Sequence, residues 1–389
     1  MPRVALIHDF LLDLRGGERV FAAICDAYPD AGVFTAVYDE HGTEGRFAAR
    51  SPQASYLQRL RPTARTFRPL LPFYPSAIES LDLRGYDIVI SSSSAWAHGV
   101  LVDPGAVHVC YCHNPFRYAW NEREATLSAR SFLTRGPLRA LLSRWRQWDW
   151  IAAQRVDTYV ANSAITAARI RRYFGRESIV LHPPVELARF SPGPVGAHYL
   201  VLAELMAHKR IDVAVRAFNA LGLPLVVVGD GPESRRLRRL AGPTVRLTGR
   251  LSDDEVADLL RTSQALIVTA EEEFGIAAVE SLASGRPVIA LRSGGVLETV
   301  TAGRTGAFYD DADDPQALAA VVRSFDPGAV DPAECVASAR RFGVERFQEQ
   351  LRAIVDETAG RSPRATERPA GGLLPRRSSR RGAESMRIR

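Results

Sequence analysis

Apolar residues recur along the chain in short runs, separated by longer stretches with the period of an amphipathic helix. The runs are almost continuously apolar rather than alternating, which is typical of strands covered on both faces in a parallel sheet. We expect strands at Val4–Ile7, Asp87–Ser91, His108–Tyr111, Thr158–Ala161, Tyr199–Ala203, Leu225–Val228, Val245–Leu247, Ala265–Val268 and Pro287–Ala290. Helices are predicted at Glu18–Ala27, Ala164–Tyr173, Ile211–Ala220, Pro232–Leu240, Asp253–Arg261, Ile276–Ser284, Gln316–Ser324 and Glu345–Asp356.

The alternation of strand and helix predicts an α/β fold of the doubly wound type, and the chain runs through the pattern twice. Prolines near residues 183 and 194 separate the two series and indicate a linker. We therefore predict a first domain over residues 1–183, a linker over 184–196 and a second domain over 197–340. A late helix follows within 341–357. Two such domains facing each other place a ligand in the cleft between their strand ends.

The basic balance of the chain comes from its C-terminal tail. The 389 residues carry a formal charge of +6, with 50 Lys plus Arg and 44 Asp plus Glu. Residues 358–389 hold nine arginines and two glutamates among Gly, Pro and Ser, so the remainder is near neutral. This tail is predicted to be disordered, and we expect no specific nucleic-acid partner. Lys209 is the single lysine of the chain.

Cysteine usage and hydropathy narrow the class of protein further. No apolar run approaches the roughly 20 residues that span a bilayer, and four cysteines do not form a disulfide framework, so a cytoplasmic protein is expected. Cys110, Cys112 and His113 are close in sequence but lack a second pair of ligands. Asp310–Asp314 contains an Asp-x-Asp, but Asp314 precedes Pro315 and a helical run, which favours capping. We predict no metal.

Two glycine-containing loops follow predicted strands. Gly16 and Gly17 open a helix after the first strand, where their backbone N–H groups could bind an oxyanion; a simple tight turn is the alternative. Gly229-Asp-Gly231-Pro is a near miss of a dinucleotide fingerprint, with Ser234 at the third glycine position. We expect this loop to lie against a nucleotide, without support for hydride chemistry.

The segment Glu271-Glu-Glu-Phe-Gly275-Ile276 precedes a predicted helix and carries the most distinctive chemistry. The N–H groups at this helix start lack intrahelical partners and can bind hydroxyls or phosphate oxygens. Glu272 lies just before the helix and Glu280 two turns later, a suitable pair for a hexose and a ribose diol. Acidic complementation of the helix dipole is the alternative, and it does not explain Glu280.

Two further regions are candidates for contact with substrate. His113, with Arg117 after it, ends an apolar strand and is expected at the cleft, although a lone histidine is usually structural. Residues 133–155 combine Arg135, Arg139, Arg144 and Arg146 with three tryptophans, and residues 59–68 are also basic. Such a helix can rest on anionic lipid, or it can be an ordinary domain face.

Many ordered motifs together resemble family 4 of the retaining glycosyltransferases. They are Gly16-Gly17, the stretch Cys112-His-Asn-Pro-x-Arg117, Asn162-Ser163 with Tyr173-Phe-Gly175, His182-Pro-Pro-Val185, His208-Lys-Arg-Ile-Asp212, Gly229-Asp-Gly-Pro232, Glu272 with Glu280, and Ser293-Gly-Gly295 with Glu298-Thr299. The resemblance covers residues 3–357 and is greatest to bacterial mannosyltransferases of surface polysaccharide assembly. It implies two Rossmann-like domains of the GT-B type, with the last helix crossing back onto the first domain.

The resemblance also implies roles for individual residues. Glu280 would bind the ribose, Glu272 the hydroxyls of the transferred sugar, and His113 the donor hexose. The N–H groups of Phe274, Gly275 and Ile276 would lie near sugar and phosphate, with Gly16, Gly17, Gly229 and Gly231 also beside the donor. Lys209 matches the lysine that contacts the pyrophosphate. The arginine that usually stands five residues earlier is replaced here by Glu204, and Arg210 is a candidate for the missing charge.

The expected reaction is transfer of a hexose, with mannose from GDP-mannose as the first candidate, to a glycan or lipid-linked acceptor. Retention requires either a covalent nucleophile or attack from the same face, and no well-placed nucleophile stands out in the sequence, so same-face attack is expected. No metal or other cofactor is expected, so cationic side chains must stabilise the leaving diphosphate. A UDP-sugar donor is an alternative. So are a sugar-nucleotide epimerase of similar fold and a non-catalytic sugar-nucleotide-binding protein. We expect a cytoplasmic location, with peripheral contact to the inner face of the cell membrane as a further hypothesis.

Overall fold

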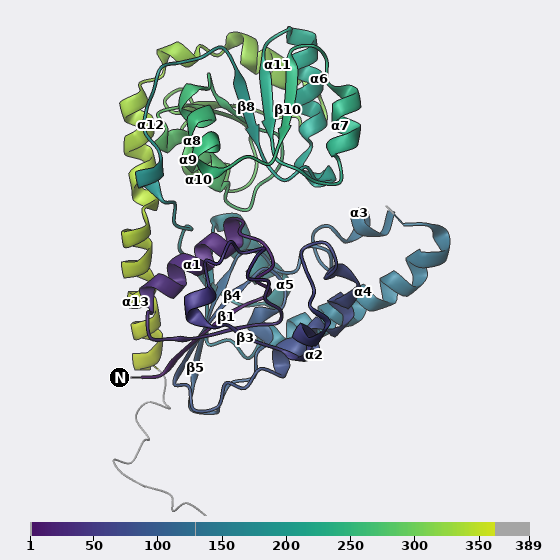
Figure 1. Ribbon diagram of the computed structural model, residues 1–389, viewed down its shortest axis with the longest axis vertical. Coiled ribbons are helices and arrows are strands. Elements are labelled where there is room, and N and C mark those ends of the chain that lie inside the picture. The colour runs from purple at the N-terminus through teal and green to yellow at the C-terminus, as the bar shows by residue number, and fades with distance from the viewer. Residues whose placement is uncertain (1, 129, 362–389) are drawn as a thin grey trace, which may run out of the picture.

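The computed structural model describes residues 2–128 and 130–361, which form two α/β domains joined by a linker and by a long C-terminal helix (Figure 1). Each domain contains one sheet whose strands are all parallel, with helices on both faces. The predicted fold class is confirmed. Of the tail predicted to be disordered, residues 358–361 belong to the last helix, and 362–389 lie outside the described residues.

The first domain has a seven-stranded sheet of order β3-β2-β1-β4-β5-β6-β7. Its strands are β1 Val4–His8, β2 Gly32–Thr35, β3 Gln53–Ala54, β4 Ile88–Ser93, β5 Val107–Cys112, β6 Thr158–Ala161 and β7 Ser178–Val180. Its helices are α1 Gly16–Ala27, α2 Tyr74–Glu79, α3 Arg123–Ser128, α4 Phe132–Ala153 and α5 Ala164–Phe174. The strand order reverses between β1 and β4, so the loops after these two strands diverge and leave room for a ligand.

The second domain has a six-stranded sheet of order β10-β9-β8-β11-β12-β13, which reverses between β8 and β11. Its strands are β8 Tyr199–Leu202, β9 Leu225–Val228, β10 Val245–Gly249, β11 Leu266–Val268, β12 Val288–Leu291 and β13 Gly306–Tyr309. Its helices are α6 Ile211–Leu221, α7 Ser234–Leu240, α8 Asp253–Thr262, α9 Ile276–Ala283, α10 Val296–Thr299, α11 Pro315–Ser324 and α12 Pro332–Ala339.

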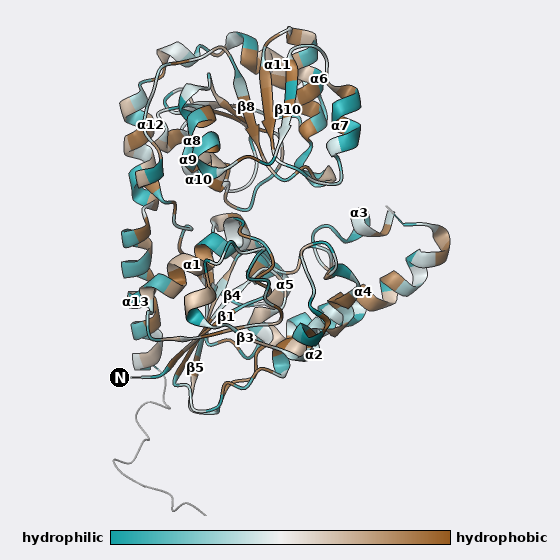
Figure 2. Cartoon of the chain, in the orientation of Figure 1, coloured by the Kyte–Doolittle hydropathy of each residue, from teal (hydrophilic) through white to brown (hydrophobic). Residues whose placement is uncertain are grey.

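The apolar runs are strands buried on both faces, as the pattern predicts. Along β9, Leu225 and Val227 pack into one hydrophobic cluster, whereas Val226 and Val228 pack into the cluster on the opposite face of the sheet. Successive side chains of a strand point to opposite faces, so a strand with helices on both sides needs apolar residues at every position. The central strands are accordingly among the most hydrophobic parts of both domains (Figure 2).

The chain passes between the two domains twice, and the two connecting segments lie side by side. Val185, in the predicted linker, pairs with Gly343, and its N–H donates to the carbonyl of Phe342 at 2.8 Å. Helix α13 (Val344–Arg361) then runs along the first domain, where Phe347 and Leu351 join the cluster that contains strand β1 (Figure 1). The helix that crosses back is therefore present, and it is longer than the predicted one.

Several short elements were not predicted. The strands β2, β3, β7 and β13 have two to four residues each, too few to show a period. Helix α4 continues for 22 residues although it contains Gly136 and Pro137. Helix α7 begins at Ser234 rather than at Pro232, since Ser234 Oγ bonds within the preceding turn to Asp230 and Gly231.

Candidate active site

The candidate residues follow the strands at the reversal points of the two sheets. Gly16 and Gly17 lie after β1, and the loop after β4 is tied to the same end by Asp9, which accepts four backbone N–H groups at 2.5–3.1 Å. In the second domain, Lys209 follows β8 and Glu272 follows β11. The carboxyl ends of parallel strands next to such a reversal are where α/β domains bind ligands.

The N-terminal ends of α1 and α9 meet across the domain boundary. A methyl group built on Gly16 would lie 3.2 Å from the Ile276 side chain, so only glycine leaves space between the two helix starts without displacing it. Arg15 precedes Gly16 as the N-cap, and its backbone N–H donates to Glu18 at 3.1 Å. The unpaired N–H groups of both first turns therefore point toward one region, which favours an anion there.

The segment before α9 takes the conformation that its glycine allows. Gly275 is the N-cap, with a φ of 89° that L side chains rarely adopt. Phe274 is buried against His182 and Phe342, which fixes the loop to the crossing segments. Two turns on, burial raises the pKa of Glu280, and the charges of Arg189 and Arg19 only partly offset this. Arg19 belongs to α1 of the first domain, so Glu280 lies near the domain boundary.

Lys209 and Glu272 form the central contact. Lys209 Nζ lies 2.6 Å from Glu272 Oε2, and both side chains are about four-fifths buried. Lys209 does not pair with Glu204, although the two residues lie in the same loop after β8. Glu204 instead accepts from Arg15 of the first domain at 2.6 Å.

The two glutamates that flank Glu272 are bound by arginines of the other domain. Arg169 of α5 contacts Glu271 at 2.6 Å and Glu273 at 3.1 Å, and Arg117 contacts Glu273 at 3.2 Å. Burial raises the pKa of Glu273, but the charges of Arg117, Lys209 and Arg169 outweigh it and hold that pKa below its usual value. Dipole complementation therefore does not account for Glu273, because its main partners are interdomain arginines.

His113 directly follows β5 and joins a chain of polar groups beneath α1. Ser92 Oγ lies 2.8 Å from His113 Nε2 and 3.1 Å from His8 Nδ1, and His8 Nε2 lies 3.8 Å from a carboxylate oxygen of Glu18. Burial, together with the neighbouring His8, lowers the pKa of His113 to about 3. His113 is therefore a neutral hydrogen-bonding group at physiological pH, not a cation.

The remaining candidates have other contacts. A Cβ at Gly229 or Gly231 would overlap the carbonyl oxygen of Ala203 or of Leu205, so both glycines are required by close backbone packing of the two loops. Arg210 forms an ion pair with Asp313, so its charge is already matched. The capping role predicted for Asp314 is confirmed, since its side chain accepts from Gln316 N at 2.9 Å.

Within residues 2–128 and 130–361, no group of three or more His, Cys, Asp or Glu side chains is placed to hold a metal ion. Cys110 and Cys112 are buried free thiols of β5, as expected. The described helices also include none that is long and apolar enough to cross a membrane.

Sequence reasoning missed the residues that connect the domains. Arg169 lies inside an ordinary amphipathic helix, and nothing in its neighbourhood distinguishes it from the other arginines of α5. Asp13 and Arg15 could have been noticed in the sequence, because both lie within three residues before the Gly16-Gly17 pair. Asp13 accepts from Arg250 of the second domain at 3.0 Å and from Arg15 at 2.8 Å.

Comparison with known proteins assigns both halves of the chain to glycosyltransferases. Residues 14–189 match the model of Glycosyltransferase Family 4, and residues 196–339 match that of Glycosyl transferases group 1. The boundary between the two matches falls in the linker that joins the domains.

Curated relatives agree with this assignment. The chain is 31% identical over 260 residues to a D-inositol 3-phosphate glycosyltransferase of Acidothermus cellulolyticus, covering 57% of this chain and 58% of that protein. It is 31% identical over 192 residues to a GDP-mannose-dependent alpha-(1-6)-phosphatidylinositol dimannoside mannosyltransferase of Mycobacterium tuberculosis, covering 44% and 50%. The chain thus spans about half the length of these relatives.

The fold itself is shared with solved enzymes. Sucrose-phosphate synthase from Thermosynechococcus elongatus superposes with a TM-score of 0.70 at 18% identity, covering 93% of this chain and all of that one. HepE of Anabaena, solved with UDP-glucose, has a TM-score of 0.68 at 15% identity, covering 92% of this chain and all of that one. With both domains matched in order and this fold in place, the chain belongs to the family 4 glycosyltransferases.

Proposed function

We propose that this protein transfers a hexose from a sugar nucleotide to a glycan or lipid-linked acceptor, with retention of anomeric configuration and without a metal. GDP-mannose is the proposed donor. The observation that carries the proposal is the Lys209–Glu272 pair, which lies where the loops after β8 and β11 meet the N-terminal ends of α1 and α9. A cation, a carboxylate and two sets of free N–H groups are what a sugar diphosphate requires.

The leaving group determines what the cation must do. As the bond between sugar and phosphate breaks, negative charge grows on the diphosphate. The Lys209 ammonium and the N–H groups near Gly16 and Ile276 stabilise that charge, because they are already in place before the reaction. Among the described residues near the cleft we find no side chain placed as a covalent nucleophile. We therefore propose same-face attack, in which the leaving phosphate takes the proton of the acceptor hydroxyl.

Glu272 and His113 hold the transferred sugar in this proposal. A donor phosphate competes with Glu272 for the Lys209 ammonium, which leaves carboxylate lone pairs of Glu272 available to sugar hydroxyls. His113 is neutral, so it can accept or donate a hydrogen bond to a hydroxyl without adding charge. Glu280, on helix α9, is assigned to the ribose, as the family resemblance implies.

The donor sugar is supported by relatives rather than by geometry. Two matched relatives carry names with GDP-mannose as donor, from Mycobacterium tuberculosis and Corynebacterium glutamicum, at 31% and 27% identity. HepE, which shares the fold, was solved with UDP-glucose. A UDP-sugar donor is therefore the second candidate, and both nucleotides belong in the first experiment.

Thermal unfolding of the whole protein against a panel of sugar nucleotides tests the donor, because only a donor bound to the folded state raises Tm. GDP-mannose should give the largest shift. In the same mixtures, slow hydrolysis of the donor, with water as the acceptor, should release GDP. An isomerised sugar still attached to the nucleotide would identify an epimerase, and binding without any release or transfer would identify a non-catalytic protein. Either result would contradict the proposed function.

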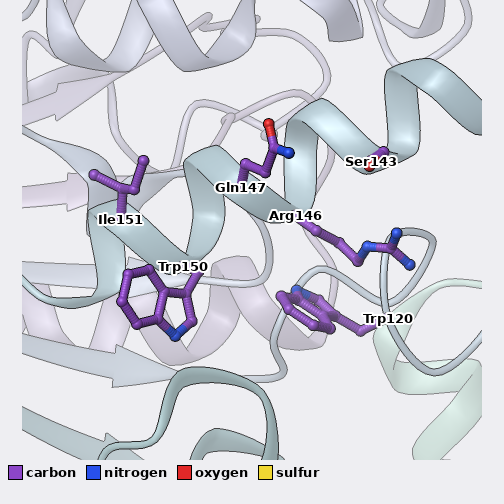
Figure 3. A pocket seen from close by; sticks show the side chains of 6 residues that line it. All are labelled: Trp120, Ser143, Arg146, Gln147, Trp150 and Ile151. Atoms are coloured by element: carbon purple, nitrogen blue, oxygen red, sulfur yellow. The ribbon is translucent and has the colours of Figure 1, made fainter.

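One outer face of α4 supports contact with a lipid surface. Residues 132, 135, 139, 146 and 150 lie within about 60° of one another on a helix of 100° per residue, and they are Phe132, Arg135, Arg139, Arg146 and Trp150. Phe132 is 87% exposed and Trp150 50% exposed. Arg146 and Trp150 also line a shallow hollow with Trp120 (Figure 3). We propose that this face binds anionic lipid and so brings the protein to a lipid-linked acceptor.

Cosedimentation with vesicles of phosphatidylcholine, with and without phosphatidylglycerol, tests the lipid contact. Replacing Arg135, Arg139 and Arg146 by glutamine should weaken binding to the anionic vesicles about 100-fold, since each arginine near the surface contributes about 1 kcal/mol. The matched control replaces three exposed arginines of α7, which changes the net charge equally; they are Arg235, Arg238 and Arg239. Equal loss in both triple variants would show that only net charge matters.

A further inference from the structure

A chain of four charged side chains crosses the domain boundary beside the proposed diphosphate site. Arg250 of the second domain contacts Asp13 of the first at 3.0 Å. Asp13 accepts from Arg15 Nε at 2.8 Å, and Arg15 Nη1 in turn lies 2.6 Å from Glu204 of the second domain. Two arginines and two carboxylates alternate, so the chain carries no net charge.

The guanidinium of Arg15 is oriented by this chain and keeps a free edge. Nε is used by Asp13 and Nη1 by Glu204, whereas Nη2 has no hydrogen-bond partner among the described residues. The side chain is 43% exposed, so a ligand can reach it. Because the guanidinium is planar and held at Nε and Nη1, the direction of Nη2 is fixed, and Nη2 can donate to a phosphate oxygen.

The position of Arg15 places that edge near the other anion-binding groups. Arg15 is the N-cap of α1 and directly precedes Gly16, where an added Cβ would lie 3.2 Å from the side chain of Ile276 at the start of α9. Its partner Glu204 stands in the same loop after β8 as Lys209. Arg15, Lys209 and the two helix starts therefore surround one region, with cations contributed by both domains.

Resting on the proposed function, we infer that Arg15 is a donor-binding residue that contacts the diphosphate from the first domain. Glu204 acts as its positioning residue. Glu204, in the loop after β8, thus holds Arg15 of the first domain in place. The diphosphate is then contacted by Lys209 from the second domain and by Arg15 from the first. Arg210 is not needed for this contact, because it is paired with Asp313.

The competing explanation is an interdomain latch, in which the Arg15–Glu204 ion pair only holds the domains together. Variants that move or reverse the charges at positions 15 and 204 distinguish phosphate binding from an interdomain latch. The variant R15A should lower kcat/KM for the donor about 100-fold, the scale of losing one preorganised donor to a developing anion. The double variant R15A/E204R returns a cation without the ion pair, so it should recover at least about 10-fold. The reversed pair R15E/E204R restores the ion pair with a carboxylate at position 15.

Rescue by R15A/E204R supports phosphate binding. Rescue by R15E/E204R alone would show a latch and overturn the inference. R250A is the matched control, because it removes the Arg250–Asp13 bond of the same chain and leaves Arg15 in place; it should change kcat/KM by less than about 5-fold. R15K keeps the charge but not the planar group, so it should be intermediate, and it provides a second variant if R15A unfolds.

Nucleotide binding gives a readout that a structural role does not move. R15A should weaken the affinity for GDP, or for UDP if that is the donor nucleotide, by about 10-fold or more while leaving the affinity for the nucleoside unchanged. Equal loss for nucleoside and diphosphate, or a kcat/KM of R15A within about 3-fold of wild type, would overturn the inference while the proposed function stands. If the wild-type protein binds no nucleoside diphosphate, both fail.

Discussion

Three single variants, Glu271→Gln, Glu272→Gln and Glu273→Gln, test which of these neighbouring carboxylates binds the transferred sugar. We predict that it is Glu272. All three glutamates are ion-paired, but with different partners. Glu272 pairs with Lys209 of its own domain, whereas Glu271 and Glu273 pair with arginines of the first domain. The three variants share the same loop and the same chemical change, so each serves as a control for the others.

The structure gives the expected magnitudes. Glu272 is only 20% exposed, and a hydrogen bond to its charged group contributes about 1.5–3 kcal/mol. Losing that contact and the orientation of the Lys209 ammonium should together cost at least about 2.7 kcal/mol, or 100-fold in kcat/KM. Glu271 is 42% exposed, and an exposed ion pair contributes less than about 1 kcal/mol, so its variant should lose less than about 5-fold. Glu273 should be intermediate, because it is 15% exposed and bound by two arginines.

The assay is the initial rate of nucleotide release at varied donor concentration, which gives kcat and KM separately. Thermal unfolding without donor shows whether each variant is folded. A Glu272→Gln variant within about 10-fold of wild type would refute the assignment of the sugar contact. A Glu271→Gln variant that loses as much activity as Glu272→Gln would refute the reasoning from partner and burial.

Three further outcomes are expected. Lys209→Ala should lower turnover by more than about 100-fold in the same assay; near-wild-type turnover would contradict its role. Burial lowers the pKa of His108 to about 3, so as the pH falls through about 6.5 this histidine becomes protonated in the unfolded chain but not in the folded one, and the folded state loses stability. Urea unfolding should show that His108 accounts for about 2 kcal/mol of the stability lost between pH 7 and pH 5. The loss of stability over this range should be smaller in the His108→Gln variant. Gly229→Ala should destabilise by more than about 3 kcal/mol, against about 1 for Gly303→Ala, which has open space.

The sequence predicts the sheets well because buried parallel strands need continuous apolar runs. Each of the nine predicted strands has a counterpart, such as β9 at the same residues, Leu225–Val228. Short strands at or next to the sheet edges were missed, because four residues such as Gly32–Thr35 carry too little pattern. Candidate residues on loops after strands could also be predicted, since topology places these loops at the same end of a sheet.

The contacts between domains could not be predicted, because they depend on how two separate sheets are oriented. Arg169 and Glu271 are 102 positions apart and meet only when the linker and α13 fix that orientation. The side-chain partner of Lys209 could not be predicted for the same reason. Its neighbour in sequence, Glu204, points to Arg15, while Glu272 reaches Lys209 from the loop after β11. Family resemblance suggested the residues, but their pairing required the fold.

The central claim is retaining transfer from a sugar nucleotide, and the anomer of the sugar first released tests it most directly. Water can serve as the acceptor, so the natural acceptor need not be known. Proton NMR of GDP-mannose with the wild-type protein, recorded before mutarotation, should show α-mannose appearing first together with GDP. β-Mannose appearing first would contradict retention and same-face attack, and no release from any sugar nucleotide would contradict the proposed activity.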